Sequence, residues 1–211
     1  MPPTADETRA RILAEAERLF RQHGYAKTTV AEIAKCCGMS PANVYRFFAS
    51  KAAINEAICA EQLAEGEALA RRIARRDEMP SARFRAFICE IHEHHRERFA
   101  KERKLHELVE VAMEQNWRTI EQYKANLRAI LAGIIADGIA EGTYPLTVPD
   151  PAARVTFNAL AKVFNPTMIA QNSHEDLDGQ AAALAAFLDG ALRAGVSGET
   201  ATDRALVGAD D

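Results

Sequence analysis

The sequence has few cysteines and no long apolar run, and each shortage excludes a class of protein. Four cysteines in 211 residues are too few for a disulfide framework, and they lack the paired spacing of a structural zinc site. The stretch AILAGIIADGIA is interrupted by Asp137 and two glycines, so no segment is predicted to span a bilayer. The first dozen residues lack the apolar run of a signal peptide. We therefore expect a cytoplasmic protein that makes no membrane contact.

One stretch near the start lacks acidic side chains altogether. The seventeen residues from Gly38 to Ile54 include Arg46 and Lys51 but no Asp or Glu, in a chain whose formal charge is −4. Up to residue 51 there are eight Arg and Lys against five acids, a net charge of +3, which leaves −7 for the remainder. This asymmetry predicts that only the N-terminal part meets a polyanion.

Almost every segment has helical periodicity and none has strand alternation, so we predict an all-α fold. A first amphipathic helix ends at Gly24, and a long helix capped by Ser50 covers roughly 51–76 until Pro80 breaks the run. Further helices are expected over 81–99, 105–113, 117–141, 150–170 and 177–194. The expected organisation is a small N-terminal domain over 1–50, a larger helical domain over 51–195 and a disordered tail over 196–211.

Two short segments after the first helix have the spacing of a helix-turn-helix motif. Ala34 is a small residue where two helices would cross, Gly38 suits a turn with positive φ, and Val44 is a branched residue that would lock the second helix onto the first. Both helices also carry N-terminal capping signals: Thr29 with Glu32, and Ser40 with Pro41.

The second helix of the motif has too few apolar residues for a core helix and no acids to repel phosphate. A helix that enters the major groove of DNA needs small side chains and hydrogen-bond donors at its start. Ser40, Ala42 and Asn43 have these properties, and Arg46 follows one turn later. Asn can pair with adenine and Arg with guanine, each worth roughly 1–3 kcal/mol of discrimination. The expected phosphate contacts are Thr29, Tyr45 and Lys51.

The stretch RILAEAERLFRQHGYAKTTVAEIAKCCGMSPANVYRFFASKAAI resembles the DNA-binding domain of the tetracycline-repressor (TetR) family. The resemblance covers about the first fifty-five residues, and beyond them it extends only to length, helical pattern and loop placement. One position departs from the family pattern: Phe47 stands where many members have a histidine. The phosphate contact of that histidine is therefore not expected here.

This resemblance implies a transcriptional repressor that a small apolar or aromatic molecule releases from a palindromic operator. It also implies a homodimer whose interface is built from the last two long helices of each subunit. The helix over 177–194 has the small residues and leucines that close packing requires, although an ordinary core helix has the same pattern. No cofactor is implied.

The resemblance further implies a ligand cavity between helices of the larger domain. His95 and Glu110 are the expected polar anchors for a ligand. Apolar stripes at helical spacing are also typical of plain core, so both interpretations stay open for the other candidates. The candidate wall residues are Phe87, Ile91, Met113, Trp117, Phe164 and Met168.

Other functions remain as alternatives. His92, His95 and His106 have spacings at which they could bind a metal, or they are ordinary histidines of charged helices. The pair Cys36 and Cys37 could sense oxidants, or it supplies small packing residues. A DNA-binding protein with no effector is a further possibility. No nucleophile–base pair or carboxylate pair has a catalytic spacing, so an enzyme is not predicted.

Overall fold

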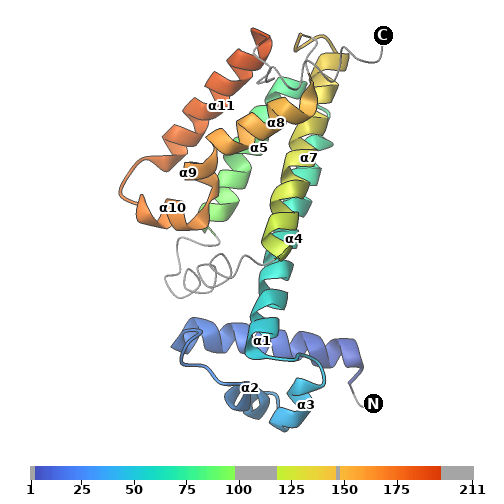
Figure 1. Cartoon of the computed structure of the whole chain (residues 1–211), viewed down its shortest axis with the longest axis vertical. Coiled ribbons are helices and arrows are strands. Elements are labelled where there is room, and N and C mark those ends of the chain that lie inside the picture. The colour runs from blue at the N-terminus through green and yellow to red at the C-terminus, as the bar shows by residue number, and fades with distance from the viewer. Residues whose placement is uncertain (1–2, 98–117, 146–147, 196–211) are drawn as a thin grey trace.

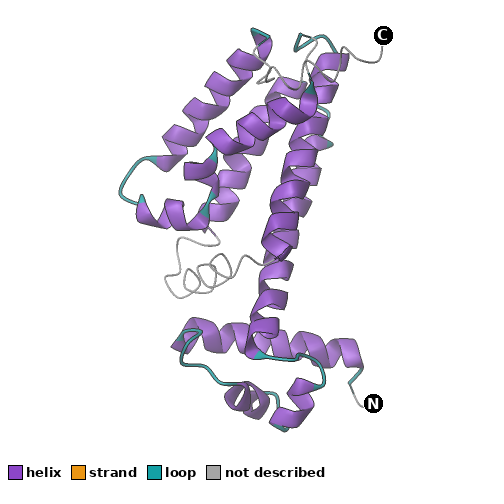
Figure 2. Ribbon diagram, viewed as in Figure 1, coloured by secondary structure: helices purple, strands orange, loops and turns teal. Residues whose placement is uncertain are grey.

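The structure is a computed structural model that describes residues 3–97, 118–145 and 148–195 of the chain. Within these ranges every regular element is helical and none is a strand (Figure 2), which confirms the predicted all-α fold. No helix in the same ranges is long and apolar enough to cross a bilayer. The helices are α1 (Ala5–His23), α2 (Val30–Cys36), α3 (Pro41–Tyr45), α4 (Lys51–Ala74), α5 (Pro80–His95), α7 (Arg118–Ala140), α8 (Pro149–Ala159), α9 (Ala161–Phe164), α10 (Pro166–Gln171) and α11 (Leu177–Arg193).

These helices form two bodies that share one long helix (Figure 1). The head consists of α1, α2 and α3 together with the first turns of α4. The body consists of α5 and α7 to α11, and its helices α5 and α7 pack against the remainder of α4. Because α4 continues without a break from one to the other, its orientation sets where the head lies relative to the body.

Side-chain caps fix where the helices of the head begin. Thr4 and Glu7 form a capping box at the start of α1, and Thr29 and Glu32 form the one predicted at the start of α2. The hydroxyl of Ser40 accepts a hydrogen bond from the backbone N–H of the third residue of α3. Each cap satisfies backbone donors that a helix N-terminus otherwise leaves open.

The head has its own apolar core, which extends into α4. Phe20, Ile33 and Val44 are fully buried there, one from each of the first three helices. Ile54 and Ile58 of α4 belong to the same core. The domain boundary predicted between residues 50 and 51 coincides with the start of α4, but the packing of the head continues about two turns further.

The core of the body lies between α4, α5, α7 and α11. Phe84, Phe87 and Ile91 of α5 are fully buried and pack with Leu127 and other residues of α7. Leu63, midway along α4, is half-buried and packs against both this core and that of the head. The two cores are therefore joined through α4.

A buried arginine ties the end of α4 to α5 and α7. The Arg83 guanidinium Nη1 donates to the Ala74 carbonyl oxygen at 2.8 Å and to Asp137 Oδ2 at 2.7 Å. Its Nε donates to the Glu78 carbonyl oxygen at 3.1 Å. The bond to Ala74 satisfies a carbonyl that the C-terminus of α4 would leave unpaired, and the bond to Glu78 holds the turn into α5.

A second buried charge fastens α11 to its neighbours. Asp189 is fully buried, and its carboxylate accepts hydrogen bonds from the Tyr144 hydroxyl at 2.9 Å and from Arg85 Nη2 at 2.6 Å. Arg85 Nε donates to the same carboxylate at 3.0 Å and Arg193 Nε at 3.2 Å. A buried carboxylate requires this full set of partners to be tolerated.

The single helix predicted over 150–170 is wrong. The chain instead forms α8, α9 and α10, with breaks at Leu160 and at Asn165. Pro166 cannot donate to the preceding turn, and the Asn165 side chain caps α10 by accepting from the N–H groups of Thr167 and Met168. The helix expected from residue 81 begins one residue earlier, at Pro80. The expected helix over 105–113 and the tail over 196–211 lie outside the described residues.

Candidate nucleic-acid interface and body cavity

The helix α3 is buried on one side and open to solvent on the other. Val44 is fully buried, and Phe48, just after the helix, is 4% exposed. Ala42, Tyr45 and Arg46 lie on the exposed side, where Tyr45 is exposed to 52% of its surface. These three of the residues proposed from sequence to face DNA are thus on the surface, and Val44, which was expected to lock the helix in place, is in the core.

The turn between α2 and α3 has the geometry that the motif requires. Gly38 adopts φ +63°, a conformation that residues with a side chain rarely take. The N–H of Met39 donates to the Ala34 carbonyl oxygen at 3.0 Å, which closes α2. Ala34 is fully buried at the crossing of the two helices. Together these features define a helix-turn-helix unit.

Two of the predicted DNA-contact residues lie at the start of α3. The Ser40 oxygen is occupied by the N–H of Asn43 at 3.3 Å, while its own hydroxyl proton remains available as a donor. The Asn43 side chain is half-buried, with its Nδ2 at 4.0 Å from the Met39 sulfur. Both residues lie at the N-terminal end of α3, the end of a recognition helix that contacts base edges in the major groove.

The first predicted phosphate contact, Thr29, already has a partner within the protein. Its backbone N–H and hydroxyl both donate to Glu32 Oε2, at 2.7 and 2.8 Å. These hydrogen bonds lower the pKa of Glu32, which is fully exposed. A phosphate at the N-terminus of α2 would therefore have to displace this carboxylate from Thr29.

Lys51, another predicted phosphate contact, lies between the head loop and α4. Its Nζ donates to the carbonyl oxygens of Tyr25 at 2.8 Å and Thr28 at 3.0 Å, and it lies 4.2 Å from the centre of the Tyr25 ring. Partial burial lowers its pKa. Two of the three ammonium protons are thus used to hold the loop before α2, and one remains for a phosphate.

One cation next to α3 was not singled out from the sequence. Arg9 of α1 lies over the Phe48 ring, with its guanidinium carbon 4.2 Å from the ring centre. Its Nη1 donates to the Phe47 carbonyl oxygen at 3.4 Å. Phe47, which replaces the histidine of many family members, is half-buried against the head core. An arginine on an amphipathic helix gives no local signal of this contact, because the contact depends on how α1 crosses the end of α3.

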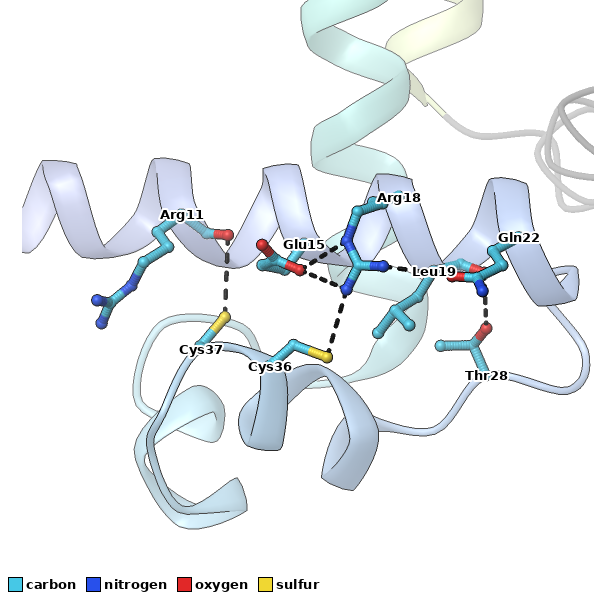
Figure 3. Close-up of polar contacts among 8 residues, drawn as sticks. All are labelled: Arg11, Glu15, Arg18, Leu19, Gln22, Thr28, Cys36 and Cys37. Carbon is cyan, nitrogen blue, oxygen red and sulfur yellow. Dashed lines mark hydrogen bonds and ion pairs between the residues drawn. The ribbon is translucent and has the colours of Figure 1, made fainter.

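Polar contacts attach α2 to the underside of α1 (Figure 3). Arg18 Nη2 lies 3.5 Å from the Cys36 sulfur, and the Cys37 thiol lies 3.8 Å from the Arg11 carbonyl oxygen. Cys36 is exposed, whereas burial raises the pKa of the Cys37 thiol and keeps it protonated. Cys37 is therefore a packing residue. The redox alternative would depend on Cys36.

The body contains a cavity of about 430 Å³ next to α4. Of the residues expected to line it, His95 and Phe164 do so. Phe87 and Ile91 are instead fully buried in the core, and Met168 is half-buried and does not belong to the cavity wall. Glu110, Met113 and Trp117 lie outside the described residues. The other described wall residues, which the sequence did not single out, are Cys59, Leu63, Ile120, Tyr123, Lys124, Leu127, Phe157, Asn158, Ala161, Asn165 and Pro166.

A buried histidine–tyrosine pair forms the polar part of the cavity wall. His95 Nε2 and the Tyr123 hydroxyl oxygen are 2.8 Å apart, and the two side chains are 4% and 7% exposed. Burial lowers the pKa of His95 to about 3, assisted by the nearby His94, and burial raises the pKa of Tyr123. Both groups are therefore uncharged at neutral pH.

His92 points away from this pair. Its Nδ1 lies 2.7 Å from the Val163 carbonyl oxygen and its Nε2 lies 3.1 Å from Asp178 Oδ1, so both ring nitrogens have partners. His106, the third histidine of the metal hypothesis, lies outside the described residues. In the part of the chain that the structure describes, no group of three or more His, Cys, Asp or Glu side chains is placed to hold a metal ion.

The exposed side of α3, the glycine turn before it and the buried anchors behind it are the features with which helix-turn-helix proteins read double-stranded DNA. The fold and this surface therefore define a DNA-binding transcriptional regulator. Two family models match the chain: bacterial regulatory proteins of the tetR family over residues 12–58, and the tetracyclin repressor-like C-terminal domain over residues 80–185. The chain belongs to the TetR family, which consists of DNA-binding regulators rather than enzymes.

Individual relatives share mainly the head and the fold. The chain is similar to the probable HTH-type transcriptional regulator ArpR of Pseudomonas putida, with 37% identity over 75 residues, a match that spans 36% of either chain. A transcriptional regulator of Cytophaga hutchinsonii has the same fold, with a TM-score of 0.69 at 21% identity over 86% of this chain and 96% of the other. So does FadR of Bacillus subtilis in complex with stearoyl-CoA, with a TM-score of 0.62 at 18% identity over 90% and 99%.

Proposed function

We propose that the protein is a cytoplasmic repressor that leaves a palindromic operator when a small apolar or aromatic molecule enters the body cavity. One observation carries this proposal: α4 takes part in both sites. Ile54 and Ile58 complete the core of the head, and Cys59, the next residue of the helix, and Leu63, about one turn further, line the cavity. A molecule that presses on Cys59 and Leu63 acts on the helix that carries the head.

The character of the cavity supports a ligand-responsive protein over a DNA-binding protein with no effector. Its volume of about 430 Å³ lies within the range of small-molecule sites, roughly 300–1,000 Å³. Most of its walls are apolar, with a few polar groups among them. The neighbour from Bacillus subtilis, which has the same fold, is a complex with stearoyl-CoA. This likeness favours a ligand in the body but not any particular one.

We propose a homodimer formed through α11 and the helices before it. Phe187 on α11 is 73% exposed and Val155 on α8 is 46% exposed, an unusual placement for large apolar side chains. On its other side α11 is fixed in the body by Ala181, Ala185 and Asp189. A palindromic operator requires the two heads of such a dimer to lie about one DNA turn or a multiple apart.

At the operator, we assign base contacts to Ser40, Ala42, Asn43 and Arg46. Phosphate contacts are assigned to Thr29, Tyr45 and Lys51, and the structure suggests Arg9 as an addition because it lies beside the end of α3. Arg46 is exposed, which suits a bidentate contact with guanine.

The test is operator binding measured by fluorescence anisotropy on DNA from the gene's own promoter, over a range of salt concentrations. If several phosphates per head are contacted, the affinity should fall by about a thousand-fold between 50 and 200 mM salt. An affinity insensitive to salt would refute the electrostatic part of the proposal. A compound screen by thermal shift then selects ligands, and one that stabilises the protein should also displace the DNA. A stabilising ligand that leaves DNA binding intact would refute release.

A further inference from the structure

A row of four rings lines one part of the cavity. Phe157 packs edge to face against Phe164, with ring centroids 5.7 Å apart and ring planes at 84°. Phe164 makes the same kind of contact with the His95 ring, at 5.7 Å and 85°, and His95 in turn packs against Tyr123 at 5.9 Å. All four side chains belong to the cavity wall. We call this set the aromatic row: Phe157, Phe164, His95 and Tyr123.

The aromatic row joins four helices of the body (Figure 1), since α8 supplies Phe157, α9 Phe164, α5 His95 and α7 Tyr123. The last three side chains are buried, and the hydrogen bond between His95 and Tyr123 fixes how two of the rings are oriented. Phe157 is half-buried and packs against the core of the body. The rings are therefore held in place by the fold itself, as in a preformed ligand site.

Rings held in this way favour an aromatic ligand over a saturated one. Each ring has a negative face and a positive edge, so a further ring in the cavity can place its own edge or face against them. Such a contact adds to the gain from apolar burial, whereas a saturated ring gains from burial alone. The aliphatic side chains of the wall, Leu63, Ile120 and Leu127, offer apolar contact to either kind of ring. The aromatic row is therefore what distinguishes the two.

The helix α4 contributes a sulfur to the same wall. Cys59 lines the cavity, and burial raises the pKa of its thiol to about 12, which keeps the thiol protonated. A neutral thiol is a weak hydrogen-bond donor, and the face of an aromatic ring is a weak acceptor. An aromatic ligand can therefore interact with the row and, through Cys59, with the helix that carries the head.

We propose that the cavity selects a molecule with an aromatic ring over one of similar size with a saturated ring, and that Phe157 is a specificity-determining residue for this choice. This inference rests on the proposed function, in which the cavity is the effector site. It narrows the ligand from a small apolar or aromatic molecule to an aromatic one. Phe157 is singled out because it is the member of the row that is only half-buried.

The experiment compares 3-phenyl-1-propanol with 3-cyclohexyl-1-propanol by isothermal titration of the full-length protein. The two probes share the propyl chain and the hydroxyl and differ only in the ring. Because the cyclohexyl ring is larger and more apolar, a cavity that responds to burial alone should bind it at least as tightly as the phenyl ring. The proposal requires the opposite order, with the phenyl probe bound about ten-fold more tightly. Equal binding, tighter binding of the cyclohexyl probe, or no binding of the phenyl probe would each overturn it.

A matched pair of variants assigns the preference to the aromatic row. Phe157→Leu keeps an apolar side chain but removes the ring, and it should lower the preference for the phenyl probe by about three-fold or more. Phe187→Leu is the control, because Phe187 is 73% exposed on α11 and is not among the wall residues. The control should keep the wild-type preference. A preference that is unchanged in Phe157→Leu, or that is lost in Phe187→Leu, would overturn the assignment.

Displacement of the operator, measured with the same two probes, separates this proposal from the one on which it rests. If the phenyl probe binds with the expected preference but the DNA stays bound, the ligand preference stands and the effector role fails. If the probes displace the DNA but the cyclohexyl probe binds as tightly as the phenyl probe, the effector role stands and the ligand preference fails.

Discussion

The buried His95 should make the protein unstable in mild acid, and His95→Gln should remove much of that sensitivity. His95 is 4% exposed and lies among His94, His92, Tyr123 and the Phe164 backbone. Its pKa is lowered from 6.5 to about 3 in the folded protein. In the unfolded chain the ring takes up a proton below its ordinary pKa, whereas in the folded protein it stays neutral until far lower pH. Acid therefore favours unfolding between these two values, and stability from this group is fully present above about pH 6.5.

The size of the effect follows from the same two pKa values. Each pH unit below 6.5 lowers the free energy of unfolding by about 1.4 kcal/mol, so at about pH 4.5 the wild type loses roughly 3 kcal/mol through this one residue. Glutamine cannot titrate, yet its side-chain amide can still either accept a hydrogen bond from the Tyr123 hydroxyl or donate one to it. Relative to the wild type, the variant should gain this amount between about pH 7.5 and about pH 4.5.

Urea unfolding followed by circular dichroism, at one fixed protein concentration, measures the difference. His23→Gln serves as the control, because His23 is exposed at the end of α1 and its loss should not restore stability in acid. Parallel pH profiles for the wild type and His95→Gln would refute the reasoning, since they would mean that His95 titrates alike in the folded and unfolded chains.

Three further predictions concern the head, the cavity and the surface of α11. In binding assays on a set of operator variants, Arg46→Ala should relax sequence preference, whereas Lys51→Ala should weaken binding to all sequences about equally; equal effects from both would mean that Arg46 contacts only the backbone. Gly66→Ala should destabilise the fold by about 1–3 kcal/mol in urea titrations, because the added Cβ would meet Tyr123 and His94. Gly133→Ala is the control, since Gly133 is also in a helix but has open space at its Cβ, and it should stabilise the fold by about 0.5–1 kcal/mol. Phe187→Glu should shift the mass measured by light scattering from that of a dimer to that of one chain while changing monomer stability by less than about 0.5 kcal/mol; an unchanged mass would place the dimer elsewhere.

Local signals in the sequence were sufficient for the head. The capping box of Thr29 with Glu32, the cap Ser40 before Pro41 and the glycine of the turn each depend on residues no more than a few positions apart. The exposed and buried sides of α3 follow from the same short spacing. Only contacts that join separate helices, such as Arg9 with Phe48, were missed there.

The body was less predictable because its site depends on distant pairs. His95 and Tyr123 are 28 positions apart and meet only when α5 packs beside α7. Phe87 and Ile91 have the same apolar pattern as true wall residues, and burial alone decided that they belong to the core. The sequence does contain a signal for the break at Asn165 and Pro166, because an asparagine followed by a proline is typical of a helix start. The apolar periodicity across 150–170 outweighed this signal in the prediction.

The placement of Leu63 against both cores bears on how such regulators can be recombined. A chimera joined at the first residue of α4 would cut Ile54 and Ile58 from the three helices whose interior they fill, and would graft foreign side chains into it. The junction of such a chimera should lie beyond Leu63, on the part of α4 that contacts only the body. To exchange the head of this protein, more than sixty residues must therefore be transferred rather than fifty.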